Sequence, residues 1–190
     1  MIKRITELAQ LHADLAIAEG DTVVDATAGN GNDTLFLAEK TGPTGQVYAF
    51  DTQGEALTVT EEKLKQHNLL ARVTLIRAGH EELTRYVSDP VSVIMYNLGY
   101  LPGGNKQITT DYSSLAASLE QGLTLLKPGG VITIVLYPGH DAGRIEKEKL
   151  FSFCAVMPSS EYAVLSSRLV NQAGDPPELI IMQKRLFILS

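Results

Sequence analysis

The sequence contains a single cysteine, Cys154, and this scarcity excludes two kinds of site. One cysteine can form neither an intrachain disulfide nor a zinc site built on cysteines. Because Cys154 lies in the apolar run at 150–156, we interpret it as a buried, unreactive thiol on a helix face. The histidines also lack the spacing of metal ligands, so we predict no metal; they are His12, His67, His80 and His140.

The chain also lacks a long hydrophobic segment. Its longest apolar stretches are about strand length, far below the roughly 20 residues that a membrane span requires. The opening residues MIKRITEL begin a helical pattern and contain neither an apolar signal core nor a small-residue cleavage site. We therefore expect a cytoplasmic protein without a membrane partner.

Positive charge is in short supply too, since 16 Lys and Arg stand against 22 Asp and Glu, for a formal charge of -6. Nucleic-acid-binding proteins are usually basic, so this balance counts against a large nonspecific footprint on a polyanion. It does not exclude a local contact to RNA. The sequence leaves the oligomeric state open, a homo-oligomer included.

What the sequence does contain is a regular alternation of strand and helix patterns, without repeats or linker-like stretches. This predicts one α/β domain spanning 1–190, with a mostly parallel sheet covered by helices on both faces. The last two strands are joined too closely for a crossover helix and must be antiparallel. We predict strands at 22–26, 46–51, 73–77, 91–97, 131–136, 162–171 and 178–185, and helices at 33–40, 54–67, 81–87, 109–126 and 142–156. A further helix begins the chain, with apolar positions between 5 and 15 and an end near 19–21.

The first strand runs into a glycine-containing loop, DATAGNGNDT at 25–34, which opens a helix. Gly29 and Gly31 let the backbone turn tightly and approach a ligand, and the helix N-terminus offers free N–H groups. Asp51 lies 20 residues after Gly31 at the end of the second strand, where a carboxylate can accept hydrogen bonds from ribose hydroxyls. A Gly-x-Gly alone would be a turn whose Asp33 complements the helix dipole; the strand, helix and Asp51 together favour a cofactor loop.

The acidic residues of this loop distinguish between cofactors. Asp25 and Asp33 flank the glycines and would repel a pyrophosphate, and Thr34 replaces the third glycine of dinucleotide loops. S-adenosylmethionine has no phosphate and carries an ammonium and a sulfonium, so we predict it rather than NAD. We expect cofactor contacts from Asp25, Thr27, Gly29, Asn30, Gly31, Asn32, Asp33, Asp51, Gln53, Gly79, His80 and Asn97.

Gly79 and His80 belong to this set because they follow the third strand, where the adenine would lie. The alternative is that Glu81 and Glu82 merely begin a helix there.

The fourth strand ends in NLGYLPGG at 97–104, which is more elaborate than a turn needs. Methyl transfer requires a nucleophile held in line with the methyl carbon, about 3 Å away. If that nucleophile is an amine, the side-chain carbonyl of Asn97 and the backbone carbonyl of Leu98 can accept its N–H groups. Tyr100 can stack on a base or simply pack. We predict that Asn97, Leu98 and Tyr100 are the catalytic residues.

Further substrate contacts are expected on the same edge of the sheet. His140 follows the fifth strand and can contact the substrate or assist proton removal, although a turn capped by Asp141 explains the segment equally well. The turn between the last two strands lies on this edge if the sixth strand is parallel to the others. The predicted substrate residues are Tyr100, Pro102, His140, Asn171 and Pro176.

The glycine loop, the NLGYLPGG segment and GDPPE at 174–178 together resemble a class I methyltransferase family long labelled "putative rRNA methylase". The resemblance covers essentially the whole chain, and the NLGYLP part is its specific element. Characterised members, of the MnmM type, methylate the amine of 5-aminomethyl- or 5-aminomethyl-2-thiouridine at the tRNA wobble position. The resemblance implies a Rossmann-like, seven-stranded sheet with an antiparallel last strand. It also implies the anticodon region of tRNA as partner and the reaction nm5(s2)U to mnm5(s2)U.

Three other hypotheses remain open at this point. The same donor can serve an acceptor in ribosomal RNA or a small-molecule amine. A noncatalytic module that binds S-adenosylmethionine or RNA would bind without turnover. A nicotinamide-dependent dehydrogenase would bind NADH tightly and S-adenosylmethionine not at all.

Overall fold

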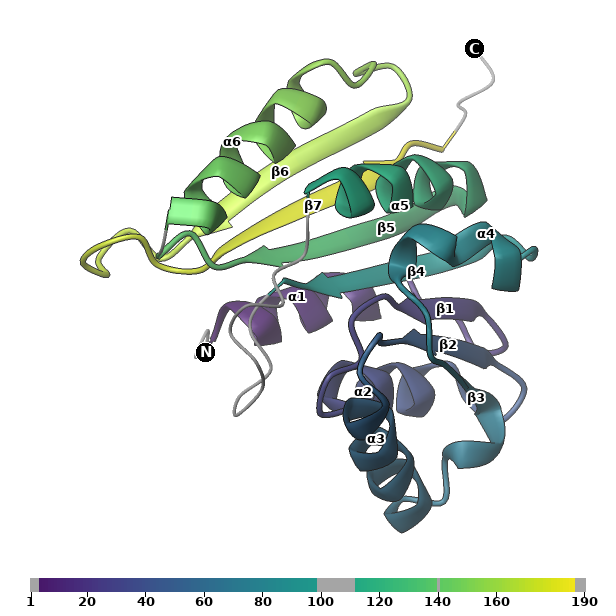
Figure 1. The fold of residues 1–190 in the computed structure, drawn as a ribbon. Coiled ribbons are helices and arrows are strands. Elements are labelled where there is room, and N and C mark those ends of the chain that lie inside the picture. Colours follow the sequence, from purple (N-terminus) through teal and green to yellow (C-terminus); the bar gives the residue numbers. More distant parts are fainter. Residues whose placement is uncertain (1–3, 99–111, 140, 187–190) are drawn as a thin grey trace.

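Figure 1 shows the fold in a computed structural model, which describes residues 4–98, 112–139 and 141–186. The strands are β1 Thr22–Asp25, β2 Gln46–Phe50, β3 Val73–Ile76, β4 Val91–Asn97, β5 Leu126–Leu136, β6 Tyr162–Arg168 and β7 Glu178–Lys184. Within the described ranges the α-helices are α1 Ile5–Asp14, α2 Asn32–Lys40, α3 Gly54–Gln66, α4 Leu83–Tyr86, α5 Tyr112–Leu125 and α6 Asp141–Ala155. Two short 3-10 helices are η1 Leu70–Arg72 and η2 His80–Glu82.

The seven strands form one sheet in the order β3-β2-β1-β4-β5-β7-β6 (Figure 1). Neighbours from β3 to β5 are parallel, whereas β7 is antiparallel to both β5 and β6. This confirms the predicted mostly parallel, Rossmann-like sheet with an antiparallel last strand. The chain first builds outward through β2 and β3 and then returns to place β4 on the other side of β1. Ligands of such sheets bind beyond the strand ends at this reversal.

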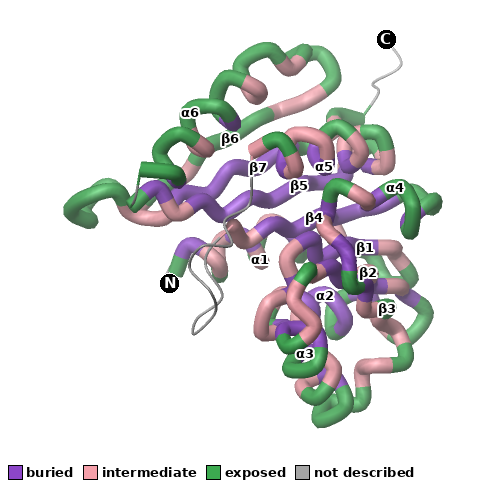
Figure 2. The backbone as a smooth tube through the Cα atoms, in the orientation of Figure 1, coloured by how far each residue is buried: buried purple, intermediate pink, exposed green. Residues whose placement is uncertain are grey.

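Alternate residues of the central strands face two different helical layers. Val23 and Val93 pack in a core with residues of α1, α2 and α3, whereas Val24 and Ile94 pack in a core with residues of α4, α5 and α6. Figure 2 shows the central strands as the buried part of the molecule. Since helices cover both faces, the run 91–96 of β4 is buried throughout, which explains its largely apolar sequence.

The beginning of β5 differs from the prediction, which placed residues 127–130 in a stop signal before a strand at 131–136. The strand begins at Leu126, whose side chain is buried and whose backbone pairs with Val91. An irregularity in the ladder between Val91 and Val93 accommodates the extra residues. Gly130 lies so close to the carbonyl of Ser92 that an added Cβ would be 2.9 Å from it. The Pro-Gly-Gly sequence therefore lies within an irregular first part of the strand and does not form a turn before it.

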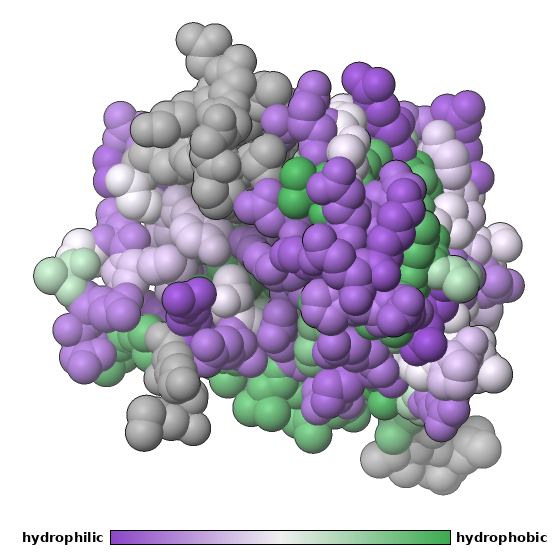
Figure 3. All heavy atoms as spheres, turned by 90° about the horizontal axis from the view of Figure 1, so that it is seen from below, coloured by the Kyte–Doolittle hydropathy of each residue, from purple (hydrophilic) through white to green (hydrophobic). Residues whose placement is uncertain are grey.

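Smaller differences occur elsewhere. The predicted helix at 81–87 is divided between η2 and α4, and β6 ends at Arg168, so Asn171 lies in a connection rather than in a strand. The predicted helix start at 109–111 lies outside the described residues. No helix in the described part of the chain has the length and apolarity needed to cross a membrane. The face seen from below in Figure 3 is mainly hydrophilic, with smaller hydrophobic areas between the polar residues.

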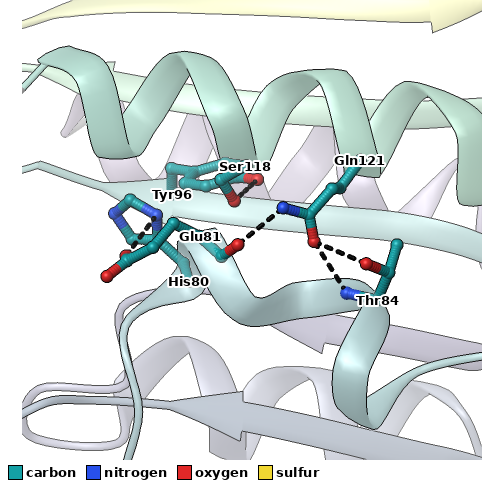
Figure 4. A network of polar contacts seen from close by, with 6 residues as sticks. All are labelled: His80, Glu81, Thr84, Tyr96, Ser118 and Gln121. Carbon is teal, nitrogen blue, oxygen red and sulfur yellow. Dashed lines mark hydrogen bonds and ion pairs between the residues drawn. The ribbon is translucent and has the colours of Figure 1, made fainter.

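A buried hydrogen bond attaches α5 to the sheet, and exposed ones attach it to the η2–α4 segment (Figure 4). The hydroxyl of Tyr96, on β4, lies 2.7 Å from the hydroxyl of Ser118, and both side chains are buried. The side chain of Gln121 donates to the carbonyl of Glu81 and accepts from the backbone and hydroxyl of Thr84, each at 2.8 Å. The position of η2 at the edge of the sheet is thus fixed by α5.

The substitution Tyr96→Phe tests the buried hydroxyl pair. It leaves the Ser118 hydroxyl without its partner, so we expect the free energy of unfolding to fall by about 1–3 kcal/mol. Urea denaturation followed by circular dichroism measures this change. Adding Ser118→Ala removes the stranded hydroxyl and should recover part of the loss; an unchanged stability of Tyr96→Phe would mean that the pair contributes nothing.

Candidate active site

Four polar residues stand where adjacent parallel strands end. Asp25 ends β1, Asp51 follows β2, Asn97 ends β4 and Tyr137 follows β5. Because these strands are parallel, their carboxyl ends lie at one edge of the sheet. This edge is where the sequence predicts the ligand.

The carboxylate of Asp25 lies under the glycine loop and is 1% exposed. One oxygen accepts a hydrogen bond from the backbone N–H of Thr27 at 3.1 Å, and the other accepts one from the hydroxyl of Thr34 at 2.6 Å. Asp25 therefore ties the start of the loop to the first turn of α2. Both of its oxygens are engaged within the protein.

The loop is also joined to the end of β4. The backbone N–H of Asn97 donates to the hydroxyl oxygen of Thr27 at 2.8 Å, directly after the ladder bond from Ala26 to Met95. A side chain of the predicted cofactor loop thus fixes the backbone of the residue predicted to bind the acceptor. This contact sets the distance between the cofactor loop and the end of β4.

Asp51 meets the loop from the neighbouring strand. Its two oxygens accept hydrogen bonds from the backbone N–H groups of Gly29 and Gln53, each at 2.9 Å. A carboxylate has about four acceptor positions, so each oxygen retains capacity for a further donor. The structure thus brings together three residues that the sequence assigns to the cofactor.

Helix α3 supports the loop from outside. The hydroxyl of Thr60 donates to the carbonyl of Gly29 at 3.1 Å, and the ammonium of Lys63 donates to the carbonyl of Asn30 at 2.5 Å and to the side chain of Asn32 at 2.6 Å. Gly31 has φ +71°, and an added Cβ would lie 2.8–3.0 Å from three atoms of Thr60. Thr60 and Lys63 were not predicted from the sequence, because polar residues on a helix carry no signal of what they touch.

A second carboxylate, Asp33, lies at the start of α2 and faces the end of β4. It accepts a hydrogen bond from the side chain of Gln10, on α1, at 2.7 Å. Burial raises the pKa of Asp33, although hydrogen bonding by the side chains of Gln10 and Asn97 lowers it. Burial and the nearby charge of Asp33 raise the pKa of Asp25 to about 7. The two acids therefore lie close enough for their charges to interact.

Tyr137 completes this group from the end of β5. Burial and the charge of Asp33 raise the pKa of its hydroxyl, whereas hydrogen bonding with the side chain of Asn97 lowers it. Gln10 and Tyr137 were not among the predicted site residues. Tyr137 adjoins the predicted His140, but nothing in the sequence connects it to Asn97, 40 residues earlier.

His80 lies on the other side of β1 and β4, in η2, and is 7% exposed. Its ring meets that of Tyr96 edge to face, with the ring centres 5.5 Å apart. Burial lowers the pKa of His80, which favours the neutral imidazole although Glu81 opposes the shift. Its Nδ1 lies 3.9 Å from the carboxylate of Glu81, too far for a hydrogen bond (Figure 4). Gly79 precedes His80, and a Cβ added at Gly79 would lie 2.2 Å from the carboxylate oxygens of Glu81.

The predicted substrate residues divide into two groups. Tyr100, Pro102 and His140 lie outside the described residues. Asn171 and Pro176 lie on the connection between β6 and β7, and because β6 runs parallel to β5 this connection is on the predicted edge. It approaches the first turn of α6, where Arg144 pairs with Asp175 at 3.3 Å. Among the described residues, Asp33 and Tyr137 are the side chains next to that of Asn97, and Gln10 reaches Asp33.

A metal site would need several histidine, cysteine or acidic side chains around one point. In the ranges that the structure describes, no three of them form a group able to hold a metal ion.

The sheet order, the glycine loop after β1, the acid after β2 and the asparagine at the end of β4 define an S-adenosylmethionine-dependent methyltransferase of the Rossmann-like class. The model of the family described as "Putative rRNA methylase" matches residues 47–183, and the chain belongs to this family. The resemblance seen in the sequence is thereby confirmed. The glycine loop precedes the matched residues.

Individual relatives agree over nearly the whole chain. The "tRNA (mnm(5)s(2)U34)-methyltransferase, chloroplastic" of Arabidopsis thaliana is 37% identical over 96% of this chain and 70% of its own length. The crystal structure of a "putative rRNA-methylase" from Clostridium thermocellum has a TM-score of 0.94 and 42% identity, covering 97% of this chain and 99% of that one. A "putative methyltransferase" from Streptococcus mutans, solved in complex with SAH, has a TM-score of 0.88 and 35% identity, covering 97% and 99%.

The close approach of Gly31 to α3 predicts the effect of Gly31→Ala. The added methyl group meets Thr60 and the backbone has a positive φ, so the loop must shift. We expect the affinity for S-adenosylhomocysteine to fall about tenfold or more, which corresponds to about 1.4 kcal/mol. Isothermal titration calorimetry measures it.

Gly174→Ala is the matched control, because Gly174 has a similar φ of +77° and no atom within 4 Å of an added Cβ. Its backbone strain should lower stability without changing the affinity for S-adenosylhomocysteine. Equal affinities for both variants would show that the contact with Thr60 does not shape the loop.

The raised pKa of Asp25 predicts a pH dependence of stability. Between about pH 4 and pH 7 the folded protein retains a proton that the unfolded chain has lost, so this group's contribution to stability decreases as the pH rises. Asp25→Asn cannot ionise and lacks this loss. Urea denaturation at several pH values should therefore show the variant gaining stability relative to the wild type from pH 4 to 7. A constant difference over that range would contradict the assignment.

Proposed function

We propose that the protein transfers a methyl group from S-adenosylmethionine to the 5-aminomethyl group of wobble uridine or 2-thiouridine in tRNA, converting nm5(s2)U to mnm5(s2)U. The observation that carries the proposal is the 37% identity, over 96% of the chain, with the relative named for this modified nucleoside. The amide and carbonyl groups at the end of β4 support it, because an amine acceptor needs hydrogen-bond acceptors there.

The described residues fit S-adenosylmethionine. Asp51 retains acceptor capacity for ribose hydroxyls, and Gly31 occupies a place that a side chain could not share with α3. The neutral His80 and the backbone of Gly79 would border the adenine. When bound, S-adenosylmethionine supplies a methyl carbon activated by a positively charged sulfur. The residues proposed to contact it, directly or through the loop they shape, are Asp25, Thr27, Gly29, Asn30, Gly31, Asn32, Asp33, Asp51, Gln53, Gly79, His80 and Asn97.

Asn97 and Leu98 hold the acceptor amine. The backbone N–H of Leu98 donates to the carbonyl of Val135 at 3.0 Å, so the chain stays in register with β5 as it leaves β4. The Oδ1 atom of Asn97 and the carbonyl of Leu98 then accept the two N–H groups of a neutral amine, and its lone pair points along the remaining direction. Orientation of this kind accounts for much of the rate of a methyl transfer.

The remaining predicted residues are proposed to contact the RNA. Tyr100 and Pro102 come two and four residues after Leu98 in the sequence, and His140 follows β5. Asn171 and Pro176 are carried by the connection between β6 and β7 on the same edge of the sheet. We propose that these residues surround the unstacked wobble base, with the anticodon region of tRNA lying across this edge.

The proposal is tested by incubating the protein and S-adenosylmethionine with tRNA that carries 5-aminomethyluridine at the wobble position. Mass spectrometry of the released nucleosides should show the gain of one methyl group on that nucleoside. Asn97→Ala should retain affinity for S-adenosylhomocysteine and lose most of this turnover, since it lacks the acceptor oxygen.

Parallel incubations with tRNA lacking the aminomethyl group and with ribosomal RNA identify the acceptor. Methylation of ribosomal RNA alone would favour the activity that the family's description names over the proposed one. Methylation of a free aminomethyl nucleoside as efficiently as tRNA would indicate a small-molecule amine as substrate. Binding of S-adenosylhomocysteine without any transfer would indicate a noncatalytic module.

A further inference from the structure

Two threonines of α3, two residues apart, use their hydroxyl groups differently. Thr58 is exposed, and its hydroxyl donates at 3.1 Å to the carbonyl of Gly54 in the preceding turn of the same helix, as a helical threonine commonly does. Thr60 is fully buried, and its hydroxyl donates at 3.1 Å to the carbonyl of Gly29 in the glycine loop. This second bond joins the helix to a segment 31 residues away in the sequence.

Two lysines of the same helix differ in a similar way. Lys65 pairs with Glu61 at 2.5 Å on the surface of α3. Lys63 forms no ion pair within the part of the chain that the structure describes, and its ammonium donates to the carbonyl of Asn30 at 2.5 Å and to the side-chain oxygen of Asn32 at 2.6 Å. Charge pairing therefore does not explain the position of Lys63, and its partners are two uncharged oxygens of the glycine loop and the start of α2.

The contacts from α3 fix the direction of two successive peptide groups of the loop. The carbonyl of Gly29 is held by Thr60 and that of Asn30 by Lys63. Both peptide groups are trans, so the N–H of each points opposite to its carbonyl. In the second group the N–H of Gly31 donates to the carbonyl of Ala28 at 2.7 Å. In the first group the N–H of Asn30 points away from α3.

This N–H differs from its neighbours in having no acceptor among the described residues. The other N–H groups between 27 and 31 donate to side chains or carbonyls of the loop and its adjoining strands, and they belong to Thr27, Ala28, Gly29 and Gly31. Asn30 is half-buried, and the residue before it is bonded to Asp51, the proposed ribose acceptor. Because backbone N–H groups in folded proteins normally have an acceptor, this one is available to a ligand.

We infer that Thr60 and Lys63 are positioning residues of the cofactor site, which hold the Gly29–Asn30 peptide so that the N–H of Asn30 donates to S-adenosylmethionine. The ribose oxygens and the carboxylate of the cofactor are the acceptors that this N–H can meet. The inference rests on the cofactor and is independent of the acceptor proposed above. It gives two polar residues of a helix a function toward a ligand that they do not touch.

Hydrogen exchange of the backbone amides, followed by NMR on 15N-labelled protein, tests the contact itself. Saturation with S-adenosylhomocysteine should slow the exchange of the Asn30 amide about tenfold or more, because it gains an acceptor. The amides of Gly29 and Gly31 already have acceptors in the protein, so they are internal controls and should change less. An Asn30 amide that exchanges equally fast with and without S-adenosylhomocysteine would overturn the inference.

The two matched pairs on α3 test the positioning residues by calorimetric titration with S-adenosylhomocysteine. Thr60→Val keeps the shape of the side chain and removes the hydroxyl, so Kd should rise about threefold to tenfold, as for loss of one hydrogen bond. Lys63→Met keeps the apolar stem and removes a charged donor, so Kd should rise about tenfold. The controls Thr58→Val and Lys65→Met alter only surface contacts of the helix and should stay within about twofold of the wild type.

Thr60→Ser separates the hydrogen bond from packing. It keeps the hydroxyl and loses a buried methyl group, so it should be less stable to urea and still bind S-adenosylhomocysteine like the wild type. Equal weakening of binding in Thr60→Ser and Thr60→Val would mean that packing is what matters, and this would overturn the inference. A wild-type Kd in both Thr60→Val and Lys63→Met would overturn it as well.

Two further outcomes keep the test decisive. If Lys63→Met does not fold, the comparison of Thr60→Val with Thr60→Ser decides alone, since both variants retain most of the side chain. A protein that binds S-adenosylhomocysteine in the expected way but does not methylate tRNA carrying 5-aminomethyluridine would overturn the proposed function and support this inference.

Discussion

The buried carboxylate of Asp25 is the interaction on which the site depends. It joins the start of the glycine loop to the first turn of α2 through Thr27 and Thr34, and the hydroxyl of Thr27 in turn holds the backbone of Asn97. Burying a carboxylate without such partners would cost several kcal/mol. Asp25 can hold the loop in place because two hydrogen-bond donors, on Thr27 and Thr34, satisfy its oxygens. The positions of the cofactor loop and of Asn97 both depend on this one group.

The sequence predicted the layers of the fold well, because its signals are local. Short apolar runs bounded by glycine and proline identify buried parallel strands, and the short connection before Glu178 requires the antiparallel pair. The start of β5 was mispredicted for a tertiary reason. Leu126 pairs with Val91 and Gly130 packs against Ser92, so a sequence that ends a helix also begins a bulged strand.

The site was predictable where it follows strand ends and unpredictable where it depends on packing. Asp51 and Asn97 were found because parallel strands bring their carboxyl ends together. Gln10, Thr60 and Lys63 were missed since each reaches the site from a helix, across 23 to 33 residues of sequence. A helix presents polar residues on every solvated face, and only the position of the neighbouring element shows which of them has a partner.

The place of β7 in the sheet has a consequence for how the protein is made. Among the strands that the structure describes, β6 pairs with β7 alone, and β7 also pairs with β5. During synthesis β6 therefore leaves the ribosome before the strand that will hold it exists. The parallel half of the sheet, from β3 to β5, can assemble early, whereas the other edge must wait for residues 178–184. Until then β5 presents an open edge, and unpaired strand edges of this kind make a folding intermediate prone to aggregation.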